Sequence, residues 1–187
     1  MSSPISKVVL DGMYSRLSNP TTGFNPVLAA AASKYSIPGF SIDFSATSPN
    51  FFFGNVSPDV VESLNRIQEN SDPSSILAYA LLTIDTLRDQ DTALVTSASF
   101  AGDIQGVISL TLAWASSQVP QTLAYWTNAC EETMYNVLSS PSNQASWTVA
   151  GLAFDRKVPM MRGAITVAGS NLRQTIQWQP MFRLIAA

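Results

Sequence analysis

One stretch of the chain, residues 104–114, limits the possible folds more than any other. Its apolar side chains recur at nearly every second position, and Gln105, Ser109 and Thr111 alternate with them. This alternation is typical of a β-strand that has one face in a core and one polar face. We therefore expect a sheet that other elements cover on one side.

Other segments supply further strands of this sheet. Residues 76–85 are apolar on both faces, which predicts a central strand. Residues 147–154 predict another strand, and residues 172–184 alternate apolar with polar side chains. Pro180 has no N–H for a ladder, so we expect the last strand at an edge, or with a bulge at Pro180. Residues 164–167 form either a short strand or part of a loop.

Three predicted helix N-termini share one sequence motif, an N-cap residue followed by proline. Ser and Asn accept a hydrogen bond from an otherwise unpaired N–H, and proline at the first helical position loses no needed donor. The three starts are Ser3-Pro4, Asn25-Pro26 and Ser57-Pro58. Between the second and third, residues 40–44 predict a period-2 strand, and the aromatic run 51–53 predicts a short packed strand.

Residues 121–138 predict a fourth helix, because apolar side chains recur there at helical spacing. We expect this helix to pack on the sheet through Leu123, Trp126, Cys130 and Met134. The four tryptophans all occupy apolar positions of their elements and are expected in the core: Trp114, Trp126, Trp147 and Trp178.

Together these elements predict the α+β class, with a twisted, mostly antiparallel sheet and helices packed on one face. Residues 1–70 form an N-terminal helical extension with short strands, and residues 71–187 form the α+β core. A length of 187 residues favours one compact domain overall.

The chain contains no histidine and a single cysteine, Cys130. Ser-His-Asp and Cys-His catalytic sites are therefore excluded, as is any zinc site with a histidine ligand. Glu131 and Glu132 are adjacent on a helix and point in different directions, so we interpret them as solvated helix surface. Cys130 lies on an apolar stripe, which indicates a buried inert thiol.

Asp85, Asp89 and Asp91 cluster near a turn, but the ligand spacing of a calcium-binding EF-hand loop is missing. Glycine-rich phosphate loops and dinucleotide fingerprints are also missing. We expect no catalytic residues, no metal and no cofactor, although a carboxylate- or lysine-based enzyme with an unrecognised site stays open.

Charged residues make up 12% of the chain, about half the usual share of ~25%, while hydrophobic residues make up 46%. This composition favours an oligomer that buries much of its surface over a monomer with a Ser/Thr/Asn-rich solvated surface. A head-to-tail ring would use two different surfaces on each subunit. We expect the edge strand near Pro180 and residues 158–171 to contribute to them.

The charge is unevenly distributed. Residues 1–154 hold five basic and twelve acidic residues, a net charge of −7, and residues 155–187 carry a net charge of +4. The basic residues of the second segment, our candidate interface or channel residues, are Arg156, Lys157, Arg162, Arg173 and Arg183. They predict contact with DNA phosphates or with an acidic neighbour, and a protein partner is favoured; a plain solvated basic face is the alternative.

The N-terminal residues lack the charged and then apolar pattern of a signal peptide, and no apolar run approaches the ~18 residues that span a bilayer. A single cysteine also fits an intracellular history. We therefore expect no membrane contact.

From Asn70 onward the chain resembles the tail-terminator (tail-completion) and neck proteins of tailed bacteriophages. The resemblance lies in Ile76-Leu77-Ala78-Tyr79, in Phe100-Ala101-Gly102-Asp103 before the strand at 105–114, in the helix at 121–138 and in the closing strands of 147–184. The run Gly23-Phe24-Asn25-Pro26, with Ile42-Asp43-Phe44, is similar to the N-terminal part of some larger phage neck proteins.

This resemblance implies an α+β subunit of a homo-oligomeric, hexameric ring that terminates the tail tube and joins it to the head connector. It implies adjacent neck and tail-tube proteins as partners, non-specific contact with DNA in the channel, assembly in the host cytoplasm and a final place in the virion. It brings no catalytic residues. Another virion subunit, such as a head-tail adaptor, tail-tube or decoration protein, is the alternative.

Overall fold

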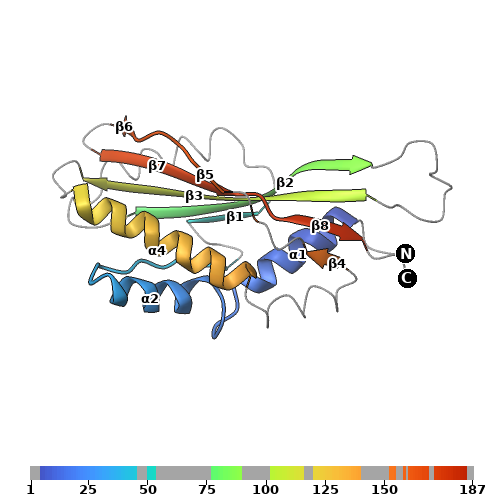
Figure 1. Cartoon of the computed structure of the whole chain (residues 1–187), viewed down its shortest axis with the longest axis horizontal. Coiled ribbons are helices and arrows are strands. Elements are labelled where there is room, and N and C mark those ends of the chain that lie inside the picture. Colours follow the sequence, from blue (N-terminus) through green and yellow to red (C-terminus); the bar gives the residue numbers. More distant parts are fainter. Residues whose placement is uncertain are drawn as a thin grey trace.

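A computed structural model describes residues 5–45, 50–53, 77–89, 102–115, 120–139, 152–154, 158, 160–168 and 171–184. Three helices lie within these residues: α1 (Ile5–Leu17), α2 (Phe24–Lys34) and α4 (Pro120–Ser139). All three lie on the same side of a β-sheet, which Figure 1 shows nearly edge-on. The described part of the chain is therefore a two-layer α+β structure, as the sequence predicted.

The sheet has the strand order β1-β2-β3-β7-β5, with β6 also paired to β7, and with β8 between β3 and β4. β1 and β2 are parallel, and every other described pair is antiparallel. The strands are β1 (Phe51–Phe53), β2 (Leu77–Asp89), β3 (Gly102–Ala115), β4 (Leu152–Phe154), β5 (Met160–Arg162), β6 (Thr166–Ala168), β7 (Asn171–Trp178) and β8 (Met181–Leu184).

The alternation within β3 sets the two faces of the sheet. Ile108, Leu110, Leu112 and Trp114 are buried and belong to the core that the helices cover. Successive strand residues point to opposite faces, so the odd-numbered residues of β3 face away from the helices. The predicted strand at 104–114 is thus confirmed, and the predicted central strand is β2, between β1 and β3.

The second helix begins two residues earlier than its Asn-Pro pair predicted. Its N-cap is Gly23, where a Cβ would lie 2.4 Å from the Asn19 carbonyl oxygen and 2.5 Å from that of Leu17. Only glycine fits such a close approach of backbone, so the chain enters the helix at this point. Asn25 therefore does not cap the helix; its amide accepts from the N–H of Ile42 and donates to the Ile42 carbonyl, at 2.9 and 2.8 Å.

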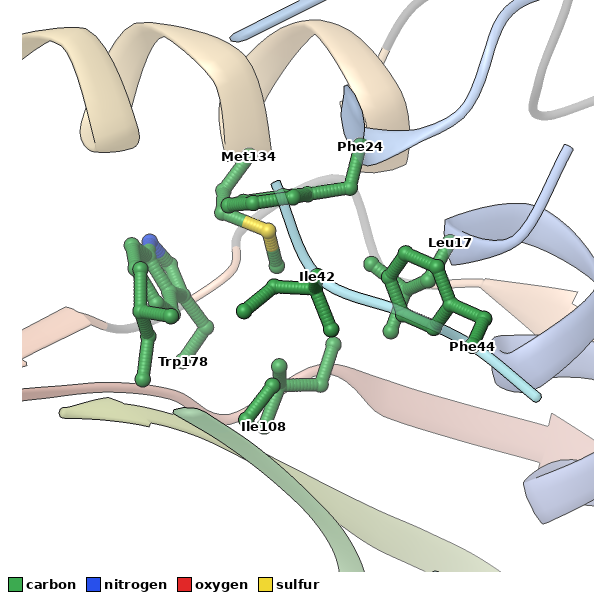
Figure 2. Close-up of a pocket in the computed structure, with 9 residues that line it drawn as sticks. Leu17, Phe24, Ile42, Phe44, Ile108, Met134 and Trp178 are labelled. Atoms are coloured by element: carbon green, nitrogen blue, oxygen red, sulfur yellow. The ribbon is translucent and has the colours of Figure 1, made fainter. Parts of the chain in front are cut away.

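This pairing replaces the strand that was predicted at 40–44. The segment is extended but belongs to no sheet, because Asn25 takes the hydrogen bonds that a neighbouring strand would supply. Figure 2 shows the segment passing between α4 and the sheet, with Ile42 pointing into the space between Met134 and Ile108. Ile42 is fully buried and closes the core from the helix side.

The terminal strand is interrupted rather than placed at an edge. β7 lies between β3 and β5, and β8 lies between β3 and β4, so the predicted edge position is wrong. The alternative, a bulge at Pro180, is not present either, because no extra residue is inserted there. Pro180 accepts a hydrogen bond from the Gly106 N–H at 2.9 Å but has no N–H to return, so the ladder only lacks a bond at this point. The ladder with β3 resumes beyond it in the same register.

The helix α4 packs as predicted through Trp126, Cys130 and Met134, all buried. The indole N–H of Trp126 donates to the Pro38 carbonyl at 2.9 Å, which joins α4 to the segment after α2. Trp114 and Trp178 are also buried.

Several predicted features lie outside the described residues. They are the cap at Ser3-Pro4, the helix after Ser57, Asp91, Trp147 and the start of its strand, Arg156 and Lys157, and the side chains of Asp85, Asp89, Leu123 and Arg183.

Candidate assembly interface

The basic residues of the C-terminal segment do not form one cluster. Arg162 lies on β5, Arg173 on β7 and Arg183 on β8. Opposite them on β3, Arg173 is paired with Ala113 and Arg183 with Asp103. Ten residues of strand separate those partners, so the backbones of the two arginines lie roughly 33 Å apart along the sheet.

The face that carries Arg173 is not open at that point. Thr111 and Ala113 lie on the same face and are both buried, and Arg173 itself is half-buried. The hydroxyl groups of Thr111 and Thr175 are hydrogen-bonded to each other at 2.9 Å across β3 and β7. Arg173 was a candidate interface or channel residue, but the part of the sheet around it is covered within the subunit.

Arg162 faces the opposite way, toward α4. Its guanidinium forms an ion pair with the Glu131 carboxylate and reaches the side-chain oxygen of Asn128 at 3.4 Å. This pair ties β5 to the helix layer. Arg162 thus fixes the position of the β5 strand, and its side chain remains partly exposed.

Glu132 makes a second ion pair on the same helix. Its two carboxylate oxygens each lie 2.9 Å from the Lys34 ammonium of α2, and the Tyr35 hydroxyl donates to it at 3.1 Å. The hydrogen bond that Lys34 donates lowers the pKa of Glu132. The same hydrogen bond and the negative charge of Glu132 raise the pKa of Lys34. Glu131 and Glu132 diverge and lie at the partly exposed surface of α4, and each in addition joins α4 to another element through an ion pair.

The β5–β6 edge, residues 160–168, is the most unusual surface of the described chain. It carries four exposed large apolar side chains, with exposed fractions of 38% for Met160, 48% for Met161, 54% for Ile165 and 76% for Val167. Both strands pair with the outer side of β7, and within the described residues no strand lies beyond them. An exposed apolar edge strand is a template for pairing with another chain.

A bulge divides this edge in two. Arg162 pairs with Ile176 and Thr166 pairs with Arg173, so the edge advances four residues while β7 advances three. An extra residue of this kind bends a strand and re-aims its side chains. Ile165 lies within the bulge and Val167 follows it, and both side chains are more than half exposed.

Residues 158–171 were predicted from the sequence to contribute to an interface, but these four side chains were not singled out. The signal was present as two apolar pairs, Met160-Met161 and Ile165 with Val167, around Gly163. Periodicity alone does not tell which side of a short strand is covered, since that depends on the neighbours.

The described residues hold little that could carry out chemistry. Burial raises the pKa of the Cys130 thiol strongly, which keeps it protonated and unreactive. A cavity of about 10 Å³ lies beside Ile42, and apolar residues from α1, α2, α4, the 40–44 segment and the sheet line it (Figure 2). Within the same residues, no three His, Cys, Asp or Glu side chains gather to hold a metal ion.

No protein-family model matches this sequence, and no curated protein matches it either. No helix among the described residues is both long enough and apolar enough to cross a bilayer.

Proposed function

We propose that this chain is a structural virion protein of a tailed-phage neck, which forms a homo-oligomeric ring that terminates the tail tube and joins it to the head connector. One observation carries the assembly part of the proposal: the apolar β5–β6 edge is exposed in a chain of which only 12% is charged. Such an edge is an aggregation hazard unless a partner covers it.

The neck assignment within this proposal is supported by the order of elements that resembles neck and tail-terminator proteins. The two-layer arrangement, with helices on one side of the sheet, fits that resemblance (Figure 1). It is a fold-level analogy, and its test is the location of the chain in the particle.

The first experiment measures the mass of the purified chain in solution and images it by electron microscopy. Closed rings, with six subunits as the expected number, support the proposal. Long open tubes would indicate a tail-tube subunit instead, and a monomer at high concentration would contradict assembly altogether.

A matched pair of variants links assembly to the edge. Val167→Asp places a charge on the β5–β6 edge, and we expect it to prevent assembly without unfolding the subunit. Tyr135→Asp is the control, because Tyr135 is similarly exposed, at 69%, but lies on α4 rather than on the edge. If the Val167→Asp protein still assembles, or if both variants lose assembly to the same extent, this edge is not an interface.

Arg183 has a separate role in this proposal: it contacts an acidic face of a neighbouring neck protein, with non-specific contact to DNA phosphates as the rival role. Charge reversal of Arg183 tests this. Loss of neck assembly by a folded subunit supports the protein contact, and normal particles with a changed rate of DNA ejection support the DNA contact. Unchanged assembly and ejection would show that Arg183 has neither role.

A further inference from the structure

We infer that residues 38–45 form a strap that opens as one unit, while the helices and the sheet stay folded, and carries Ile42 out of an apolar groove between α4 and the sheet. The strap includes the extended segment 40–44, and the inference does not depend on the proposed ring. Three properties of the strap lead to it. Only side chains hold its backbone, the chain on either side of it is fixed independently, and Ile42 fills its groove incompletely.

Two asparagine side chains take the place of a neighbouring strand along the strap. Asn25 of α2 bonds both the N–H and the carbonyl of Ile42. Asn50 accepts from the Asp43 N–H at 2.9 Å and donates to the Ser41 carbonyl at 3.1 Å. Within the described part of the chain, the strap makes no hydrogen bond to another backbone group. Its opening therefore breaks side-chain contacts but no strand ladder, so it requires less free energy than unfolding of the sheet.

Two further side chains hold the strap near its two ends. The Trp126 indole N–H of α4 donates to the Pro38 carbonyl at 2.9 Å. The Tyr14 hydroxyl of α1 donates to the Phe44 carbonyl at 2.6 Å. The strap is thus bound by side chains from α1, α2, α4 and residue 50, which are all fixed to the body of the subunit. Because these contacts converge on eight consecutive residues, we expect them to form and break together.

The chain before and after the strap is held without it. Before the strap, α2 ends in a cap of its own, because the Ile37 N–H donates to the Ala32 carbonyl at 3.1 Å. Ser36 takes the left-handed conformation of such a cap, with a φ of 54°. After the strap, the Asn50 carbonyl accepts from the Ala80 N–H of β2 at 2.8 Å. α2 and the sheet can therefore keep their places when the strap opens.

The strap is anchored in the core by one side chain. Of its residues, all of which the structure describes, only Ile42 is buried, and it points between α4 and the sheet (Figure 2). Ser41, Asp43 and Ser45 are exposed. A cavity of about 10 Å³ remains beside Ile42, and a side chain that faces unfilled space loses packing contacts there. The closed strap is therefore weakly held at its deepest point.

The open strap uncovers a surface that the closed strap hides. When Ile42 leaves, the space that it fills and the cavity beside it become one groove that is open to solvent. Apolar side chains from α4, β3 and β7 line this groove, among them Met134, Ile108 and Trp178 (Figure 2). The strap thus acts as a latch that determines whether this apolar groove is covered.

Native-state hydrogen exchange of the full chain tests this opening. Mass spectrometry on fragments follows the Ile42 and Asp43 amides, with the slowest β3 amides as the reference for global unfolding. We expect the strap amides to exchange faster than this reference. Urea below the unfolding transition should hardly change their rate, because local opening exposes little surface, whereas the β3 amides should accelerate steeply.

Two results would overturn the inference. If the strap amides exchange at the β3 rate and with the β3 dependence on urea, the strap opens only when the whole chain unfolds. If they exchange as fast as amides of an unstructured peptide, the closed strap does not exist. Neither result bears on the proposed ring.

A pair of tyrosine variants tests whether the strap opens as one unit. Tyr14→Phe removes the hydroxyl that bonds the Phe44 carbonyl and keeps the ring. We expect the Ile42 and Asp43 amides to exchange about 2- to 10-fold faster, although they bond to Asn25 and Asn50 and not to Tyr14.

Tyr135→Phe is the matched control, because it removes the hydroxyl of a tyrosine that is 69% exposed on α4 and should leave both exchange rates unchanged. If Tyr14→Phe leaves the Ile42 and Asp43 rates unchanged, the parts of the strap open separately and the inference is wrong. An equal acceleration in both variants would overturn it too, since exchange would then not depend on the Tyr14 contact.

Discussion

The core around Ile42 and the β5–β6 edge contain the same kinds of side chain, yet they have opposite environments. Ile42 lies in extended chain and is fully buried, whereas Ile165 lies in a strand bulge with 54% of its surface exposed. The difference is coverage: α4 lies over Ile42 (Figure 2), whereas more than half of the Ile165 side chain is left exposed. Apolar character therefore contributes to folding in one region and is available for assembly in the other.

The largest expected effect comes from removing the anchor that closes the core. Trp126→Ala deletes a buried indole and its hydrogen bond to the Pro38 carbonyl. We expect a loss of about 3–5 kcal/mol in the free energy of unfolding, measured by chemical denaturation. Tyr125→Ala is the control, because that side chain is 44% exposed and should cost far less. Equal costs would contradict the packing of α4.

A second pair of variants tests the comparison directly. Ile42→Thr puts a hydroxyl into an apolar site and removes packing, so we expect a cost of about 2–4 kcal/mol. Ile165→Thr makes the same chemical change at the edge and should alter the free energy of unfolding by less than about 0.5 kcal/mol. That variant should instead weaken assembly. Similar unfolding free energies for the two variants would remove the distinction between the regions.

A third variant tests the attachment of the 40–44 segment. Asn25→Ala removes both side-chain hydrogen bonds to the backbone of Ile42, and we expect a cost of about 1–3 kcal/mol. Asn25→Asp keeps the acceptor for the Ile42 N–H but loses the donor, so its cost should be intermediate. Denaturation midpoints of the three proteins would show this order, and a neutral Asn25→Ala would mean that packing alone holds the segment.

The smallest effect concerns the exposed pair between α2 and α4. Because the pKa of Glu132 is lowered in the folded chain, its stabilisation is present above the pKa of an unfolded glutamate and is lost as pH falls through the folded value. Because the pKa of Lys34 is raised, its share is present below the unfolded lysine value and is lost as pH rises through the folded one. The pair should thus stabilise between these limits.

Denaturation midpoints across pH check this prediction. Glu132→Gln should reduce the fall in stability on the acid side, and Lys34→Met should give the same reduction. The double variant should add little to either. If the denaturation midpoint falls with decreasing pH equally in both single variants and in the unmodified chain, the ion pair contributes no measurable stability. Many exposed ion pairs behave in this way.

The elements with long patterns follow from the sequence alone. The alternation in β3 and the helical stripe of α4 each repeat over several turns or residue pairs, so burial of one face follows from periodicity. Composition was equally decisive for chemistry, because a chain without histidine cannot form whole classes of catalytic site.

For signals of only one or two residues, the tertiary structure decides which role the residue takes. Asn25 has the side chain of an N-cap, but the close approach of backbone at Gly23 moved the helix start and left Asn25 to hold Ile42. Pro180 indicated an edge strand, yet β5 and β4 cover the strands on either side of it, and only the local break remains.

The candidate interface was predicted only in outline. Residues 158–171 could be named because they are short, mixed and interrupted by glycine and proline, but the exposed apolar side chains could not. The exposure of Val167 depends on which strand lies beside it and on which element covers that strand, and both come from contacts between residues distant in sequence. The local sequence pattern determines which side chains are apolar and favour burial. The packing of the whole chain determines which of these side chains stay exposed and can contact a partner.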